Sequence, residues 1–278
     1  MNSDLPMGMY TPDSPEGRGY RADPADNYSA IKKMDASPLH YQDASERGVF
    51  QTPAMALGVV GHVATLQPEL LDSAAAVFEG GARRGKAWTE FQAEHAGQII
   101  LKADEMERIK AMADAVRSHP VASQYLKGHA EMSMFWKDQY TGLRCKGRPD
   151  IICGDVVVDL KTTTDASPAA FSRQCANLFY HAQAAFYQDG YELVTSIEPR
   201  SVYIVAEVKP PYDVVVYDAD PDMINIGRDA YHEWLVKLEE CRKSNVWPGR
   251  APTAAVPLTL PPWAMPREDD DLTDLGLE

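Results

Sequence analysis

Residues 147–165 read GRPDIICGDVVVDLKTTTD, and this stretch decides the fold. Two apolar runs flank a Cys-Gly-Asp turn, which is typical of two neighbouring β-strands. Side chains alternate between the faces of a strand, so Asp159 and Lys161 share one face while Val158 and Leu160 share the other. A buried acid is costly unless it is paired or binds a metal. The stretch therefore marks either an ordinary ion pair at a strand end or a functional site.

The composition indicates one soluble globular domain with extensions, or at most two domains. The 278 residues are 45% hydrophobic and 24% charged. We find no apolar run of about 20 residues, the length that a membrane span needs, and the N-terminus does not resemble a signal peptide. The four cysteines form no C-x-x-C pattern, so we expect reduced thiols in a cytoplasmic protein rather than a zinc ribbon or a disulfide framework.

The net charge of −14 is unusual for a protein that binds nucleic acid. The last twelve residues contain six acids and one arginine, so the rest of the chain still carries about −9. Any basic surface must therefore be a local patch. The candidates are residues 83–86 (Arg-Arg-Gly-Lys) and the group Arg144, Lys146 and Arg148. Ordinary solvated surface is the alternative for both.

The order of predicted elements divides the chain into four parts. Residues 1–28 are rich in Pro, Gly, Asp and Ser and are predicted to be a flexible segment. Residues 29–120 are predicted to be helical, and residues 130–244 to be a core of strands and helices. Together these two parts form a single domain over residues 29–265, and residues 266–278 form an acidic tail.

Within the core, the alternating pattern predicts three antiparallel strands over residues 130–136, 143–153 and 154–163. Helical periodicity predicts one helix over residues 89–120 and another over residues 166–194. Later segments predict a hairpin and a final helix. The fold class is therefore α/β (α+β), with a central mixed or antiparallel sheet flanked by helices.

The two aspartates of the opening stretch can converge on one point. Asp150 begins the first apolar run, Asp159 ends the second, and neighbouring strands lie about 4.8 Å apart. Two acids this close repel each other unless a cation lies between them, and oxygen ligands suit Mg²⁺ or Mn²⁺. Lys161 would reach past the metal toward a water or a phosphate oxygen. A metal, a water nucleophile and a fixed positive charge are the requirements of phosphodiester hydrolysis.

The pattern Pro149-Asp150 followed by Asp159-Leu160-Lys161 resembles the signature of the PD-(D/E)XK nuclease superfamily. Residues 183–187, QAAFY, resemble the Q-x-x-x-Y element of its recombination-exonuclease branch, which includes RecB-type and lambda-exonuclease-type nucleases. Residues 57–69, LGVVGHVATLQPE, resemble a helix of small residues with a histidine in the exodeoxyribonuclease VIII family of phage and prophage exonucleases. The resemblance extends from about residue 28 to residue 265.

This resemblance implies a restriction-endonuclease-like core and a set of site residues. The implied catalytic residues are Asp150, Asp159, Lys161, Gln183 and Tyr187. The implied ligands of Mg²⁺ (or Mn²⁺), two ions in all, are His62, Asp150, Asp159 and the backbone carbonyl of Leu160. Glu131 is a further candidate ligand, with a solvated strand residue as the alternative. Arg148, Lys146 and Arg144 are candidate DNA contacts.

The resemblance also implies an activity and partners. It implies a metal-dependent DNA exonuclease that degrades linear double-stranded DNA ends 5′-to-3′ for phage-type recombination. It further implies a ring-shaped homo-oligomer, trimer or tetramer, and a single-strand annealing protein as partner, in the cytoplasm of a bacterial host. Two alternatives stay open: a non-catalytic DNA-end binding protein of recombination, and a structural α/β protein whose charges pair with each other.

A second acid-x-Lys pattern occurs at Glu207-Val208-Lys209. No Pro-Asp pair comes shortly before it, and no Q-x-x-x-Y element follows it. We therefore predict an exposed strand face for this segment, in contrast to Asp159-Leu160-Lys161. Taken alone, His62 and Tyr187 would be interpreted as core residues, and only the ordered set of motifs favours a site.

Overall fold

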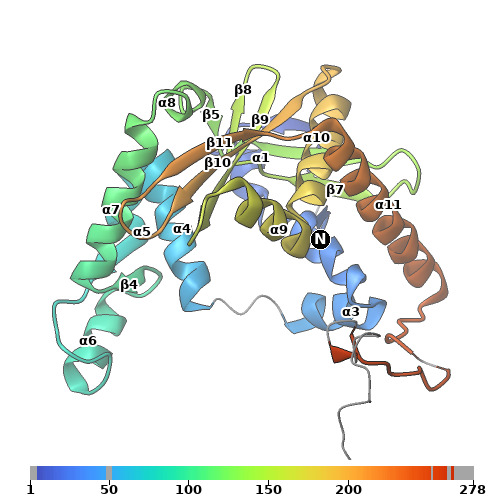
Figure 1. The fold of residues 1–278 in the computed structure, drawn as a ribbon, viewed down its shortest axis with the longest axis horizontal. Coiled ribbons are helices and arrows are strands. Elements are labelled where there is room, and N and C mark those ends of the chain that lie inside the picture. Colours follow the sequence, from blue (N-terminus) through green and yellow to red (C-terminus); the bar gives the residue numbers. More distant parts are fainter. Residues whose placement is uncertain (1–4, 48–51, 252, 262–263, 266–278) are drawn as a thin grey trace, which may run out of the picture.

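The structure is a computed structural model that describes residues 5–47, 52–251, 253–261 and 264–265. A central sheet lies between two groups of helices, with α7 and α4 on one side and α9, α10 and α11 on the other (Figure 1). In the described ranges, no helix combines the length and the apolar character that crossing a membrane requires. The predicted acidic tail, residues 266–278, lies outside the described residues.

The central sheet has the strand order β11-β10-β9-β8-β5. β9 runs parallel to β10, and the other neighbouring strands are antiparallel. A parallel pair requires a long crossover connection, and helices α9 (Pro168–Leu178) and α10 (Tyr180–Thr195) provide it. The prediction of a mixed sheet flanked by helices is confirmed. The strands are β5 (His129–Ala130), β8 (Ile151–Cys153), β9 (Val156–Thr163), β10 (Arg200–Glu207) and β11 (Val214–Asp218).

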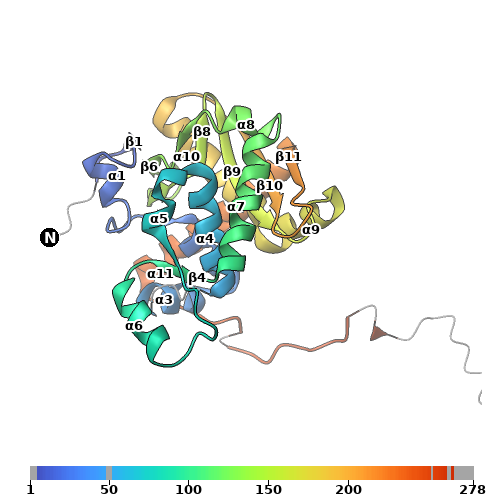
Figure 2. The same cartoon turned by 90° about the vertical axis from the view of Figure 1, so that its left-hand side faces the viewer.

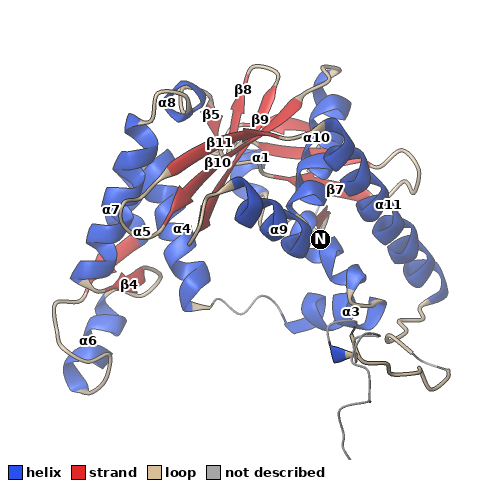
Figure 3. Cartoon of the chain, in the orientation of Figure 1, coloured by secondary structure: helices blue, strands red, loops and turns tan. Residues whose placement is uncertain are grey.

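Both faces of this sheet are covered, which explains why β9 and β10 are apolar almost throughout. Leu160 and Ile204 pack on one face with Met112 of α7 (Ala103–Ser118). Tyr203 and Val205 pack on the opposite face with residues of α10 and α11 (Pro221–Ser244). Figure 3 shows the strands in red between these two helical layers. The charged residues at the end of β9 are therefore set into an apolar core.

A second sheet has the order β1-β6-β7-β2 and includes the N-terminal residues. β1 (Gly8–Tyr10) pairs with β6 (Ser133–Lys137), and β2 (Asp26–Asn27) pairs with β7 (Arg144–Gly147). The prediction of a flexible segment over residues 1–28 is therefore wrong for residues 5–27. Local composition misled it, because polar residues such as Asp23 are tied down by contacts distant in the sequence. The Asp23 carboxylate accepts hydrogen bonds from the backbone of Leu5 and the side chain of Arg144.

Two of the three predicted strands are each divided between the two sheets. The first divides into β5 and β6 at Glu131, whose φ of 56° lies in the left-handed region. The second divides into β7 and β8 around Pro149, which lacks the N–H that a ladder needs. The backbone N–H of Glu131 donates to the carbonyl of Asp150 at 3.0 Å, which joins the two bends. Asp150 thus lies at the junction of the sheets.

Both long predicted helices are also interrupted. Residues 89–120 form the end of α6 (Lys86–Glu94), β4 (Ile99–Leu101) and α7, because Gly97 takes a φ of 93° and β4 pairs with β3 (Ala75–Val77). Residues 166–194 form α9 and α10, which meet at Phe179 with a left-handed φ of 57°. Figure 2 shows α6 at the periphery, beyond α4. The other helices are α1 (Pro15–Gly19), α2 (Tyr28–Ile31), α3 (Pro38–Arg47), α4 (Pro53–Leu66), α5 (Leu71–Ala74) and α8 (Ala122–Tyr125).

Contacts near the two ends of the domain join its helical part to its core. Arg242 on α11 forms a two-pronged ion pair with the buried carboxylate of Asp26, at 2.7 and 2.8 Å. Tyr41 on α3 donates to the same carboxylate at 2.7 Å and stacks on Trp247, with ring centroids 5.8 Å apart. Residues 26–41 and 242–247 therefore stabilise each other, as a single domain requires.

Candidate active site

The pairing of β8 with β9 brings Asp150 and Asp159 together. Asp150 immediately precedes β8, and Ile151 lies opposite Val158, so the aspartates flank the last paired position. Oδ2 of Asp150 accepts a hydrogen bond from the backbone N–H of Leu160 at 2.6 Å. Both side chains are almost completely buried. The convergence that the sequence predicted is therefore present in the structure.

The pKa values of the two carboxyl groups shift in opposite directions because their partners differ. Burial opposes the charge of Asp150, but His62, Lys161 and the Leu160 N–H outweigh it and lower its pKa. Burial dominates at Asp159 and, with the neighbouring charge of Asp150, raises its pKa to about 6 in spite of Lys161. A divalent cation at this point would remove the repulsion that raises the pKa of Asp159.

Lys161 lies on the same face of β9 as Asp159 and forms an ion pair with it. Its ammonium also donates to Oε1 of Gln183 at 2.8 Å and lies 4.2 Å from the centre of the Tyr180 ring. Burial disfavours the charge, but Asp159 and Asp150 outweigh it and raise the pKa of Lys161. Lys161 is therefore a fixed, protonated donor at neutral pH.

Helix α10 positions the Lys161 side chain through Gln183 and Tyr187. Gln183 Nε2 donates to the Tyr187 hydroxyl at 3.3 Å, so the two residues act from one helix face. The ring of Tyr187 also packs against Gly147, where an added Cβ would lie 3.0 Å from it. Burial holds the pKa of Tyr187 well above its usual value, so the phenol stays neutral. Tyr187 is thus both a core residue and the end of the chain of hydrogen bonds that starts at Lys161.

Helix α4 presents His62 to the aspartates. Its Nδ1 lies 3.2 Å from Oδ1 of Asp150. The helix approaches α7 closely because Gly61 has no side chain: an added Cβ would lie 2.9 Å from the Met112 methyl group. Burial disfavours the imidazolium, but Asp150, followed by Asp159, outweighs it and raises the pKa of His62 to about 9. Gly61 thus has a packing reason, and the close approach of α4 brings the histidine to the site.

Glu131 lies at the edge of this group, at the junction of the sheets. Burial and the charge of Asp150 raise its pKa to about 7, while His62, Arg148 and Arg21 partly offset this effect. Its backbone bond to Asp150 fixes its position. The structure therefore places Glu131 beside the other candidates rather than on a freely solvated strand.

The three basic residues predicted to contact DNA have different surroundings. Arg148 donates to Ser133 and to the carbonyl of Gly17, and lies 4.2 Å from the centre of the Tyr20 ring. The charge of Arg148 lowers the pKa of Glu131, so Arg148 borders the site. The other two side chains serve the N-terminal segment. Lys146 is 4% exposed and donates to the carbonyls of residues 20 and 23, and Arg144 pairs with the carboxylate of residue 23 at 2.8 Å. These contacts remove Lys146 and Arg144 from the predicted basic surface.

Tyr180 is a site neighbour that the sequence analysis did not select. Its ring lies under the Lys161 ammonium, and it is three residues before Gln183 on α10. Positions three apart share a helix face, so this spacing was the signal that could have identified it. The sequence analysis did not select Tyr20 either. Its partner Arg148 is too distant in the sequence for a local pattern to indicate the contact.

The donor set fits a hard divalent cation. In the described part of the chain, no group of three His, Cys, Asp or Glu side chains already has the arrangement of a metal site. Oδ2 of Asp159 is nevertheless buried beside the ammonium of Lys161, with which it forms the ion pair. The carbonyl of Leu160 faces the Asp150 side, because the N–H and C=O of a strand residue point the same way. Carboxylate and carbonyl oxygens are the ligands that Mg²⁺ and Mn²⁺ prefer.

A mixed sheet that brings a Pro-Asp corner beside an Asp-x-Lys strand end defines the PD-(D/E)XK class of fold. Residues 27–256 match the model of a family described as "PDDEXK-like domain of unknown function (DUF3799)", and the chain belongs to this family. The fold is also similar to the crystal structure of a protein described as a "Putative exonuclease" from Eubacterium rectale. The TM-score is 0.61 at 13% identity, over 90% of this chain and 93% of that one. No protein of curated function matches the sequence.

Proposed function

We propose that this protein is a metal-dependent DNA exonuclease that hydrolyses phosphodiester bonds. One observation carries the proposal: Asp150, Asp159 and Lys161 lie together in a buried site, with Gln183 bonded to the lysine. A purely structural pair would need one acid for one lysine. Here a second acid, Asp150, and the histidine His62 converge on the same buried point, which is a larger set of ligand-type side chains than one ion pair needs.

Asp150, Asp159, His62 and the Leu160 carbonyl would hold Mg²⁺ or Mn²⁺, and Glu131, whose backbone N–H donates to the carbonyl of Asp150, is a further candidate ligand. The bound ion would supply a nucleophilic water at neutral pH and charge stabilisation at the phosphate. The side chains of the protein orient these groups and exclude bulk water, since both aspartates are buried.

Lys161 acts in this proposal as a donor rather than as a base. Its pKa is raised, so its ammonium keeps the proton and donates to the attacking water or to a phosphate oxygen. Gln183 holds this ammonium in place, and the Tyr187 hydroxyl bonded to Gln183 limits the rotation of the amide. Arg148, which borders the site, is the proposed contact to a neighbouring phosphate.

The finer features rest on the resemblance to exodeoxyribonuclease VIII-like exonucleases. We propose linear double-stranded ends as substrate, 5′-to-3′ digestion, and a ring-shaped oligomer that works with a single-strand annealing protein in phage-type recombination in a bacterial cytoplasm. The net charge of −14 is compatible with DNA binding when the positive groups are confined to a cleft.

The experiment that tests the proposal is digestion of linear duplex DNA, labelled at either the 5′ or the 3′ end, in the presence of Mg²⁺. Wild-type protein should shorten the labelled strand progressively, and chelation of the metal should stop the reaction. Covalently closed circles should remain intact, which separates an exonuclease from an endonuclease. Salt-sensitive DNA binding without any metal-stimulated cleavage would instead favour the end-binding alternative.

A further inference from the structure

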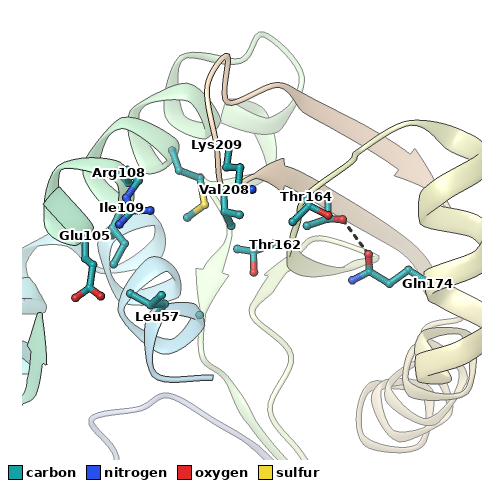
Figure 4. A pocket seen from close by; sticks show the side chains of 12 residues that line it. Leu57, Glu105, Arg108, Ile109, Thr162, Thr164, Gln174, Val208 and Lys209 are labelled. Carbon is teal, nitrogen blue, oxygen red and sulfur yellow. Dashed lines mark hydrogen bonds between the residues drawn. The ribbon is translucent and has the colours of Figure 1, made fainter. Parts of the chain in front are cut away.

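A groove of about 410 Å³ opens beyond the candidate active site, at the end of β9 (Figure 4). Five parts of the chain contribute to its wall. They supply Gly58 from α4, Arg108 from α7, Thr162 from β9, Gln174 from α9 and Lys209 from the segment after β10. Two of these elements, α4 and β9, also carry the candidate catalytic and metal-binding residues, so the groove and the site share their walls.

The edge of β9 in this groove has free backbone groups. β8 pairs with β9 only as far as Val158, whereas β10 pairs with it as far as Thr163. The N–H of Leu160 points to the free edge, because it reaches Asp150. Backbone groups alternate along a strand, so those of Thr162 point the same way. Within the described residues, the side-chain hydroxyl of Thr162 makes no hydrogen bond either.

Gly58 keeps the groove open. It lies four residues before the histidine of the site, and residues four apart share a helix face. A Cβ added at Gly58 would meet no atom within 4 Å, in contrast to Gly61, whose lack of a side chain lets α4 pack against α7. Close packing therefore does not require a glycine at position 58. A larger side chain there would project into the open space of the groove.

The groove combines cationic and apolar surfaces, and the carboxylate of Glu105, which also lines it, pairs with Arg83. Lys209 is exposed, and its ammonium forms no ion pair with a described residue. Among the residues that the structure describes, Arg108 pairs only with the exposed Asp104, at 2.6 Å, and such surface pairs are weak. Arg173 lines an adjoining hollow that shares residues 163 and 164 with the groove. The apolar part of the wall consists of Leu57, Ile109, Met112 and Val208.

We propose that this groove binds the DNA strand adjacent to the phosphate that is cleaved. Lys209 and Arg108 contact phosphate oxygens, the Thr162 hydroxyl and N–H donate to the strand, and the apolar wall packs against a base. Two observations favour this occupant: the cations complement a phosphodiester in an otherwise acidic protein, and α4 and β9, which carry candidate site residues, also form part of the groove wall. The inference rests on the proposed nuclease function and adds a subsite to it.

Binding of a fluorescein-labelled single strand of about 12 nucleotides to the full-length protein tests the inference. Fluorescence anisotropy would be measured with EDTA present, so that cleavage does not interfere. We expect Gly58→Val, Arg108→Ala and Lys209→Ala each to raise the Kd at least about fivefold. The two charge variants should also reduce the slope of log K against log salt by about one each. Lys110→Ala, an exposed lysine on α7 outside the groove, is the matched control and should change the Kd less than about twofold.

The outcomes separate this inference from the nuclease proposal. An unchanged Kd for Gly58→Val and Lys209→Ala, in a protein that cleaves DNA, overturns the groove and leaves the nuclease. Weaker binding by these variants, in a protein that cleaves nothing, supports the groove and overturns the nuclease. An equal loss in Lys110→Ala indicates general electrostatic attraction and also overturns the groove. Circular dichroism establishes that each variant is folded, and Lys209→Glu at the same exposed site provides a second test with a larger expected loss.

Discussion

Two segments of acid-x-Lys form lie at the ends of the neighbouring parallel strands β9 and β10 and have different surroundings. In Asp159-Leu160-Lys161 both charged side chains are nearly buried. In Glu207-Val208-Lys209 the glutamate ends β10 and accepts a hydrogen bond from Ala166 N–H at 3.0 Å, and Lys209 is exposed. The register places Glu207 opposite Thr163, four residues beyond Asp159. The acid-x-Lys pattern therefore forms part of the candidate site only where a second acid, Asp150, and a helix that carries Gln183 lie beside the strand.

The largest expected effect is the loss of DNA cleavage when Asp159 or Lys161 is replaced. Asp159→Asn and Lys161→Ala should each reduce cleavage of end-labelled duplex at least about 100-fold, because each removes a group that faces the phosphate. Glu207→Gln, which keeps an acceptor for Ala166, should remain within about twofold of wild type. Full activity in Asp159→Asn and Lys161→Ala would refute the site assignment. Calorimetric titration with Mn²⁺ gives a second readout, since Asp159→Asn should lose binding heat.

The second largest effect is expected for Gln183, which contacts Lys161 and has no hydrogen-bonded counterpart at Lys209 among the described residues. Gln183→Leu should lower kcat by about 10- to 100-fold, because Lys161 loses the acceptor that orients it. Tyr187→Phe removes only a hydroxyl 3.3 Å from that amide and should change kcat less than about threefold. A reversed order of these two effects would show that the tyrosine, not the glutamine, positions the lysine.

A third prediction compares a buried acid outside the site with an exposed one. Burial opposes the charge of Asp23, but hydrogen bonds from Leu5 N–H, Ala25 N–H and Arg144 outweigh it and lower its pKa. Its stabilising contribution is therefore fully present above its unfolded pKa of about 4 and is lost as the pH falls through the lower folded value. Asp23→Asn should reduce the free energy of unfolding at pH 7 by about 1–2 kcal/mol.

Chemical denaturation between pH 2 and pH 7 measures this effect. The stability difference between wild type and Asp23→Asn should shrink as the pH falls below about 4. Asp13→Asn, at an exposed position, is the control and should cost less than about 0.5 kcal/mol. A difference that is constant over the whole pH range would show that the charge of Asp23 has no stabilising role.

The smallest effect is expected for the hydrogen bond made by Glu207. Glu207→Ala removes the acceptor for Ala166 N–H and should lower the free energy of unfolding by about 0.5–1.5 kcal/mol. Its rate of DNA cleavage per folded molecule should stay within about twofold of wild type. Thermal melting and a cleavage assay on the same sample measure both values, and a tenfold loss of cleavage would place Glu207 in the site after all.

The sequence was sufficient to predict which candidate side chains lie side by side where local rules apply. The alternation in β9 placed Lys161 beside Asp159, and the spacing of four in α10 placed Gln183 beside Tyr187. The fates of Arg144 and Lys146 were not predictable, because their partners are carbonyl and carboxyl groups more than 120 residues away. The interruptions at Glu131 and Phe179 were also not predictable. Non-glycine residues rarely adopt a positive φ, and no local sequence pattern indicates one here.

The ion pair between Asp26 and Arg242 spans 216 positions of the sequence. During synthesis, Asp26 is made early, and nearly the whole domain must be translated before its partner Arg242 is made. A truncated chain that stops before α11 would leave a buried carboxylate without its cation. The packing around Asp26, at the start of the domain, is thus complete only after α11 has been made.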